Sequence, residues 1–202
     1  EPAADARIEG PATPLEDWIA PYAPGPIAYV RQGFDAPLAI LFSSGTTGKP
    51  KCIVHGAGRL LLAHRKEHRL HCDLRAGDRF FYYTTCGWMM WNWLVTGLAA
   101  GATLVTYDGN PAYPGQARLA DLIDAEAITL FGTSAKYIDA CRKAGLEPRH
   151  THSLASLRTV CSTGSPLLPD GFAHIYRDWK ADVHLASISG GTDICACFVG
   201  GV

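Results

Sequence analysis

Short apolar runs alternate with longer segments of helical pattern through most of this sequence, and this alternation constrains the fold more than any other feature. The expected strands span residues 38–42, 52–55, 79–83, 102–107, 129–131, 157–162 and 183–187. The expected helices span residues 58–70, 88–99, 119–125, 134–144 and 169–180, the last with Pro169 near its first turn. Strands that alternate with helices pair into parallel sheets, which the helices cover. The sequence therefore predicts an α/β fold with a largely parallel sheet.

The first 37 residues differ from the rest because they contain seven prolines. That density predicts an irregular lead-in, with at most a short helix over residues 15–19. The remaining residues, 38–202, are expected to form one domain, since 202 residues with 48% hydrophobic side chains suffice for one core.

Composition excludes several classes of function. The net charge of −1 provides no basic stripe for nucleic acid. An odd number of cysteines, seven, without regular spacing, argues against a disulfide framework and for the reduced thiols of a cytoplasmic protein. The apolar stretch 88–100 is interrupted by Asn92, Thr96 and Gly97, so it is too short to span a bilayer. The missing initial methionine suggests a piece of a longer protein.

Three loops carry glycine together with hydroxyl side chains, and each follows an apolar strand. They are residues 43–51, 163–166 and 187–193. Ligands of parallel sheets bind beyond the carboxyl ends of the strands. We therefore expect the three loops to line one shared polar pocket.

The first of these loops, within LFSSGTTGKPK (41–51), has the composition of a polyphosphate-binding loop. Gly45 and Gly48 allow backbone N–H groups to turn inward. Hydroxyls and a lysine add donors for phosphate oxygens. It is not a Walker loop, because only two residues separate the glycines and Pro50 follows Lys49. The plain alternative is an ordinary turn with solvated lysines.

The string Phe42–Lys51 matches, at every position, the phosphate-loop signature of the adenylate-forming superfamily, Phe/Tyr–Ser/Thr–Ser–Gly–Ser/Thr–Thr–Gly–x–Pro–Lys. This superfamily contains acyl-CoA synthetases, luciferases and peptide-synthetase adenylation domains. Segments 78–114, 131–148, 162–167 and 189–201 resemble its acetoacetyl-CoA synthetase branch. The resemblance covers residues 36–202 and implies part of the large N-terminal domain of the adenylate-forming fold.

The resemblance implies a nucleotide site in the three loops. The ATP phosphate loop would comprise Ser43, Ser44, Gly45, Thr46, Thr47, Gly48 and Lys51. The loop against adenine would comprise Gly164, Ser165 and Pro166, with Ser187 at the adenine amine and Gly191 beside it. Ser165 departs from the acidic residue common in acetyl-activating relatives. Thr192 would contact the α-phosphate and Asp193 would hold Mg²⁺, where most relatives carry glutamate.

The resemblance also implies an acid-binding pocket. Met89, Met90 and Thr163 align with its walls, and Trp88 with a residue near the pantetheine tunnel. Gly190 stands where acetyl-CoA synthetases carry a tryptophan that closes the pocket on a two-carbon acid. We hypothesise that the missing ring admits acetoacetate. Simple core packing is the alternative for the aromatic run 88–93.

The implied reaction has two halves and uses ATP, Mg²⁺ and coenzyme A. A carboxylate attacks the α-phosphorus of ATP, and the CoA thiol then displaces AMP from the acyl-adenylate. Catalysis would come from positioning and from charge placed around the phosphates. The family's ribose-binding aspartate, hinge and C-terminal lid with its lysine are not in this sequence, so the chain alone is expected to be inactive. A medium-chain acyl-CoA synthetase and a non-catalytic nucleotide-binding module stay open as alternatives.

Two further groups of residues invite a metal or redox interpretation. His64, His68 and His71 share one face of an expected helix, a spacing that can bind a metal. The cationic side chains Arg65, Lys66 and Arg69 crowd the same turns, so we expect a solvated helix instead. For Cys195 and Cys197 we expect small buried thiols.

Overall fold

A computed structural model describes residues 12–43 and 48–201. The chain divides into two compact units, Glu1–Gln32 and Gly33–Val202. In the first unit, α1 (Leu15–Ile19) confirms the predicted short helix. None of its residues is buried, and its Trp18 ring lies against Tyr22 with a centroid separation of 6.1 Å.

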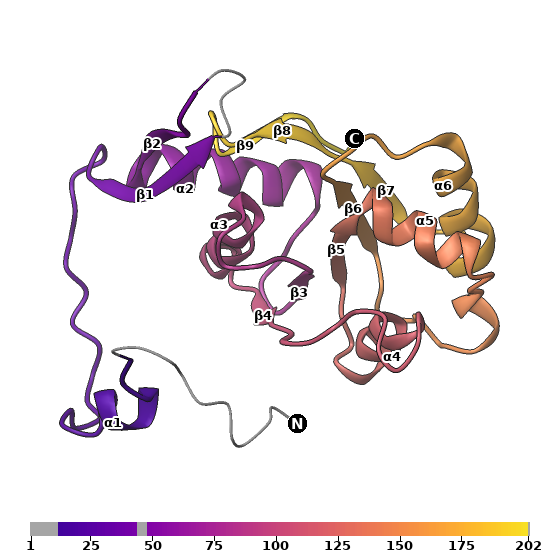
Figure 1. Cartoon of the computed structure of the whole chain (residues 1–202), viewed down its shortest axis with the longest axis horizontal. Helices are drawn as coiled ribbons and strands as arrows, with labels where there is room; N and C mark the ends of the chain where they lie inside the picture. Colours follow the sequence, from indigo (N-terminus) through magenta and orange to yellow (C-terminus); the bar gives the residue numbers. More distant parts are fainter. Residues whose placement is uncertain (1–11, 44–47, 202) are drawn as a thin grey trace. The chain divides into compact units, whose positions relative to one another are not determined.

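The second unit is built on a five-stranded parallel sheet with strand order β4-β3-β5-β6-β7 (Figure 1). Its strands are β3 (Arg79–Tyr82), β4 (Thr103–Val105), β5 (Leu130–Ser134), β6 (Thr159–Thr163) and β7 (His184–Ser187). The predicted parallel sheet is therefore confirmed, with boundaries within a few residues of the expected ones.

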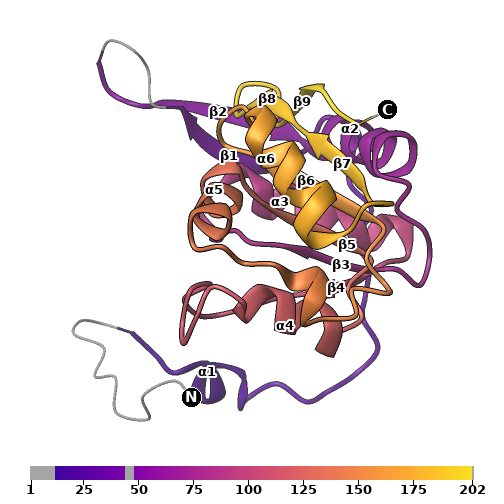
Figure 2. The ribbon, with the colours of Figure 1, turned by 90° about the vertical axis from the view of Figure 1, so that its right-hand side faces the viewer.

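Helices cover both faces of this sheet (Figure 2). One face packs against α4 (Arg118–Ala125), α5 (Ala135–Lys143) and α6 (Pro169–His174), which continues into the π-helix η4 (Ile175–Trp179). The other face packs against α3 (Met89–Val95), the 3₁₀ turn η2 (Thr96–Ala100) and the segment around Cys72 and Leu74. Neighbouring strand residues alternate between the two cores, so Phe81 belongs to the first and Phe80 and Tyr82 to the second. A strand buried on both faces reads as a continuous apolar run.

Tyr82 and Gly132 form a cross-strand pair in which the ring lies over the glycine. A Cβ on Gly132 would lie 1.9 Å from the Tyr82 ring, and the Tyr82 hydroxyl donates to Thr133 O at 3.1 Å. The ring also packs edge-on against Trp88 and Trp93, with centroid separations of 6.2 and 5.8 Å. The absence of a side chain at Gly132 therefore makes room for the Tyr82 ring, which in turn packs against both tryptophans.

We expect Gly132→Ala to lower the free energy of unfolding by about 2 kcal/mol, because the Tyr82 ring must leave its buried position. Urea denaturation measures this change. Gly87→Ala is the matched control, since no heavy atom lies within 4 Å of a Cβ at Gly87. Its change should stay below about 0.5 kcal/mol. Equal stabilities of the two variants would contradict the packing argument.

The strand before the glycine-rich loop does not join the parallel sheet. β1 (Pro37–Ser43) pairs antiparallel with β2 (Lys51–Gly56) in a separate hairpin. The expectation that all three glycine-hydroxyl loops follow strands of one sheet was therefore wrong for residues 43–51. The connection of residues 44–50 suits an antiparallel pair, because parallel neighbours need a crossover of about a dozen residues.

A second ribbon was not predicted. β8 (Ser189–Gly191) and β9 (Ala196–Val199) pair antiparallel directly after β7. Figures 1 and 2 both place this ribbon beside the β1–β2 hairpin. The α2 helix (Ala57–Lys66) and the π-helix η1 (Glu67–His71) lie next to β9 and η2. The two glycines of β8 lower its strand propensity, and β8 and β9 are only three and four residues long, which explains why sequence pattern missed them.

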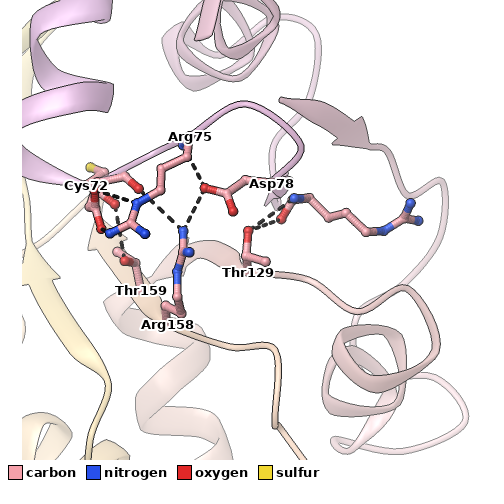
Figure 3. Close-up of polar contacts among 8 residues, drawn as sticks. Cys72, Arg75, Asp78, Thr129, Arg158 and Thr159 are labelled. Atoms are coloured by element: carbon pink, nitrogen blue, oxygen red, sulfur yellow. Dashed lines mark hydrogen bonds and ion pairs between the residues drawn. The ribbon is translucent and has the colours of Figure 1, made fainter. Parts of the chain in front are cut away.

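A polar network holds the amino-terminal ends of the strands (Figure 3). The buried Asp78 carboxylate accepts hydrogen bonds from Arg75 N–H and Arg158 Nη2, both at 2.7 Å. Thr159 Oγ1 donates to Cys72 O at 3.3 Å. These contacts tie the segment before β3 to the start of β6. They lie at the end of the sheet opposite to the carboxyl ends, where the predicted pocket would be.

Across the described residues, no helix is both long and apolar enough to cross a bilayer.

Candidate functional site

A cavity of about 360 Å³ opens beyond the carboxyl ends of β6 and β7, against α3. It is lined by the acid-site residues predicted from the sequence and by six of the predicted nucleotide-site residues, none of them from the phosphate loop: Trp88, Met89, Met90, Thr163, Gly164, Ser165, Pro166, Ser187, Gly190, Gly191 and Thr192. Glu67, Trp93, Ile188, Ser189, Ala196 and Cys197 complete the lining and were not predicted. The structure therefore brings two of the three predicted loops together with the aromatic segment after β3.

Two side-chain hydrogen bonds fix the loops after β6 and β7 to each other. Thr163 Oγ1 donates to Ile188 O at 2.8 Å, and Ser187 Oγ accepts from Leu167 N–H at 3.3 Å. The strands are in register at this point, with Ser162 opposite Ser187. The hydroxyls of Thr163 and Ser187 thus fix the loops at the rim of the cavity, whatever contact they make with a ligand.

The most buried polar side chain that lines the cavity is Glu67, which is 1% exposed. Oε2 accepts from Trp93 Nε1–H at 2.9 Å, and Oε1 accepts from Cys197 N–H at 3.0 Å. Sequence reasoning missed Glu67 because it stands in a run of charged residues, 64–69, that reads as a solvated surface. It assigned Trp93 only to core packing. A glutamate that interrupts such a run carries no signal of its burial.

Burial raises the pKa of both ribbon thiols near Glu67, and the negative charge of Glu67 contributes. The pKa of Cys197 rises to about 12 and that of Cys195 to about 11. Both are therefore protonated at neutral pH and supply no thiolate nucleophile. Cys195 is buried, as expected, and Cys197 is half-buried.

The expected solvated face of His64 and His68 is wrong, because both side chains are fully buried. Burial lowers the pKa of His64 and lowers the pKa of His68 to about 3, so both rings are neutral at physiological pH. The neighbours Arg65 and Arg69 are exposed on the opposite side of the same turns. Their charge gave the segment its polar pattern and concealed the buried face.

Three histidine rings hold the backbone of the segment that contains β8 and β9. His55 Nε2 lies 2.9 Å from Thr192 O, and His71 Nδ1 lies 2.9 Å from Gly201 O. The His64 ring donates to Cys195 O through Nε2, and its Nδ1 lies 2.8 Å from Thr96 Oγ1. These rings therefore position the ribbon that carries Gly190, Gly191 and Thr192.

The predicted phosphate loop is the connection of the β1–β2 hairpin. Ser43 pairs with Lys51 at its base, and Gly48 has a φ of +114°, a backbone conformation that favours glycine. Ser44, Gly45, Thr46 and Thr47 lie outside the described residues. The contact between His55 on β2 and Thr192 O joins the hairpin to the cavity wall.

Asp193 is exposed beside the cavity and does not line it. A Cβ placed on Gly191 would lie 3.8 Å from Asp193 Oδ2, so the carboxylate turns back toward the rim. Among residues 12–43 and 48–201, no group of three or more His, Cys, Asp or Glu side chains converges as a metal site.

Gly190 lines the cavity, but its backbone also faces β9. A Cβ on Gly190 would lie 2.1 Å from Ala196 O and 2.8 Å from Cys197 Cα. The ribbon thus requires glycine here for its own pairing. A tryptophan at this position needs a different path of the ribbon.

Comparison with known proteins identifies similar chains. A profile described as AMP-binding enzyme matches residues 7–200. The acetoacetyl-coenzyme A synthetase of Rhizobium meliloti (strain 1021) is 62% identical over 192 residues, which are 95% of this chain and 29% of that protein. The acetoacetyl-CoA synthetase of Xenopus tropicalis is 53% identical over 167 residues, 83% of this chain and 25% of that protein.

Among solved structures, the acetoacetyl-CoA synthetase from Streptomyces lividans superposes with a TM-score of 0.87 at 48% identity. The match covers 96% of this chain and 31% of that one. The chain thus spans less than a third of the length of each of these relatives.

Proposed function

Because the chain belongs to the AMP-binding enzyme family, we propose that it forms part of a longer AMP-forming ligase that converts acetoacetate into its CoA thioester. The membership confirms the superfamily resemblance found in the sequence, and the identities of 62% and 53% confirm the resemblance to acetoacetyl-CoA synthetases. The substrates would be small molecules: acetoacetate, ATP and coenzyme A.

The observation that carries this proposal is that residues predicted at the nucleotide and residues predicted at the acid line one cavity. Residues expected at the nucleotide, such as Gly164 and Thr192, line the same space as residues expected at the acid, such as Met89 and Gly190. An acid bound there would have its carboxylate next to the α-phosphate of a nucleotide at the rim. Adenylation requires this proximity and no protein nucleophile.

Within this proposal the residues act by positioning and by charge. Thr192, half-buried at the cavity wall with its carbonyl held by His55, would donate its hydroxyl to the α-phosphate. The loop of Ser43, Ser44, Gly45, Thr46, Thr47, Gly48 and Lys51 would bind the β- and γ-phosphates. Gly164, Ser165, Pro166, Ser187 and Gly191 would hold the adenine side.

Asp193 would be one carboxylate ligand of Mg²⁺, which neutralises phosphate charge when bound. We also place the intact protein in the cytoplasm, a proposal supported by seven cysteines that form no disulfide.

The test is ATP–pyrophosphate exchange by the intact protein that carries this sequence, with acetate, acetoacetate, butyrate and octanoate compared at equal concentration. We expect acetoacetate to support the fastest exchange. Fastest exchange with octanoate would instead establish the medium-chain alternative. Nucleotide binding without exchange for any acid would establish the non-catalytic alternative.

A further inference from the structure

We propose that the buried carboxylate of Glu67 selects the acid by charge, admitting short acids with an uncharged far end and rejecting dicarboxylic acids. This inference deepens the proposed function and rests on it. It assigns a specificity-determining role to the most buried polar residue of the cavity lining.

The residues that line the cavity range from exposed to fully buried. Gly164, Ser165 and Pro166 at the rim are exposed, whereas Trp93 and Glu67 are 2% and 1% exposed. The reacting carboxylate must meet the nucleotide at the rim. The far end of a short acid therefore points toward Glu67.

Both carboxylate oxygens of Glu67 accept hydrogen bonds. Each oxygen accepts one N–H, from Trp93 and from Cys197, and Lys66 Nζ lies 3.7 Å from Oε1. A carboxylate has about four lone-pair sites, so capacity for a further donor remains. The Lys66 side chain is 48% exposed, so water screens its charge and the negative field inside the cavity persists.

A second carboxylate at the far end of the acid would face this buried charge. Two like charges about 5 Å apart, at an effective dielectric constant of about 20, repel enough to weaken binding on the order of 100-fold. An amide at the same place is neutral and donates N–H to Glu67. The methyl ketone of acetoacetate is neutral as well.

Glu67 also holds Trp93 and the β9 backbone, so its loss has a structural effect on any acid. Two competing acids of equal size distinguish charge selection from that structural effect. Malonate and malonamate differ only in carrying a carboxylate or an amide at the far end. Their inhibition constants against acetoacetate-dependent exchange give a ratio that a purely structural change leaves unaltered.

We expect malonamate to compete about 100-fold more tightly than malonate with the intact wild-type protein. Glu67→Gln, which keeps the size and removes the charge, should reduce this preference to less than about tenfold. Trp93→Phe is the matched control, because it removes the indole N–H and keeps both the ring and the Glu67 charge. Its preference for malonamate should be at least that of the wild type.

Equal inhibition of the wild-type protein by the two acids overturns the inference, whether or not the variants fold. An unchanged ratio in a folded Glu67→Gln variant also overturns it. Failure of the proposed function is a different result, since then no acid, acetoacetate included, supports exchange. If malonate and malonamate inhibit equally while acetoacetate-dependent exchange is intact, only the role proposed for Glu67 is contradicted.

Discussion

Replacing Gly190 with alanine is expected to lower the free energy of unfolding by about 3 kcal/mol and to abolish most activity. The added Cβ would lie 2.1 Å from Ala196 O, and this neighbour is backbone that no rotamer change moves aside. The β8–β9 pairing must therefore open, and with it the wall of the cavity. Urea denaturation and ATP–pyrophosphate exchange of the intact protein measure the two effects.

Gly191 provides the control for this prediction. A Cβ there meets its nearest atom, Asp193 Oδ2, at an ordinary 3.8 Å. The stability of Gly191→Ala should stay within about 1 kcal/mol of the wild type. A Gly190→Ala protein as stable as the Gly191→Ala protein would show that the ribbon tolerates a side chain at 190. In that case β8–β9 pairing would not require glycine at 190, and only the hypothesis that the missing side chain admits acetoacetate would account for it.

Thr192→Val should lower kcat for acyl-adenylate formation about 100-fold, since it removes one hydroxyl donor from the developing charge at the α-phosphate. Valine keeps the β-branched shape. The contacts of Thr192 O with His55 Nε2 and Cys195 N–H involve only the backbone and should survive. The ribbon should therefore remain folded, and the loss should appear in kcat rather than in stability.

Thr192→Ser is the partner variant because it keeps the hydroxyl and removes only the methyl group. Its kcat should remain within about tenfold of the wild type. Pre-steady-state formation of acyl-adenylate by the intact protein distinguishes the two. If serine and valine reduced kcat equally, the hydroxyl would have no role in the first half-reaction.

Local periodicity was enough to predict most of the fold. Strands such as Phe80–Tyr82 are covered on both faces, so their apolar runs identify them whatever their neighbours are. The order of strands and helices then implied a parallel sheet. The same order put residues 163–166 and 187–193 at one edge, where the cavity lies.

The missed features depend on contacts between distant segments. The burial of His64 and Glu67 depends on the ribbon, which supplies Cys195 O and Cys197 N–H as partners 131 and 130 residues away. The β1–β2 hairpin likewise has Leu38, Ile40 and Phe42 exposed, so its apolar run indicated a strand but not which sheet it joins. Pattern within a segment carries no information on such partners.

The central claim is that one cavity unites the acid with the nucleotide. The most direct test is a crystal structure of the intact protein with a non-hydrolysable acetoacetyl-adenylate analogue. We predict the phosphate beside Thr192 and the acyl chain between Met89 and Gly190, with its methyl end toward Glu67. An acyl chain bound outside this cavity would contradict the account.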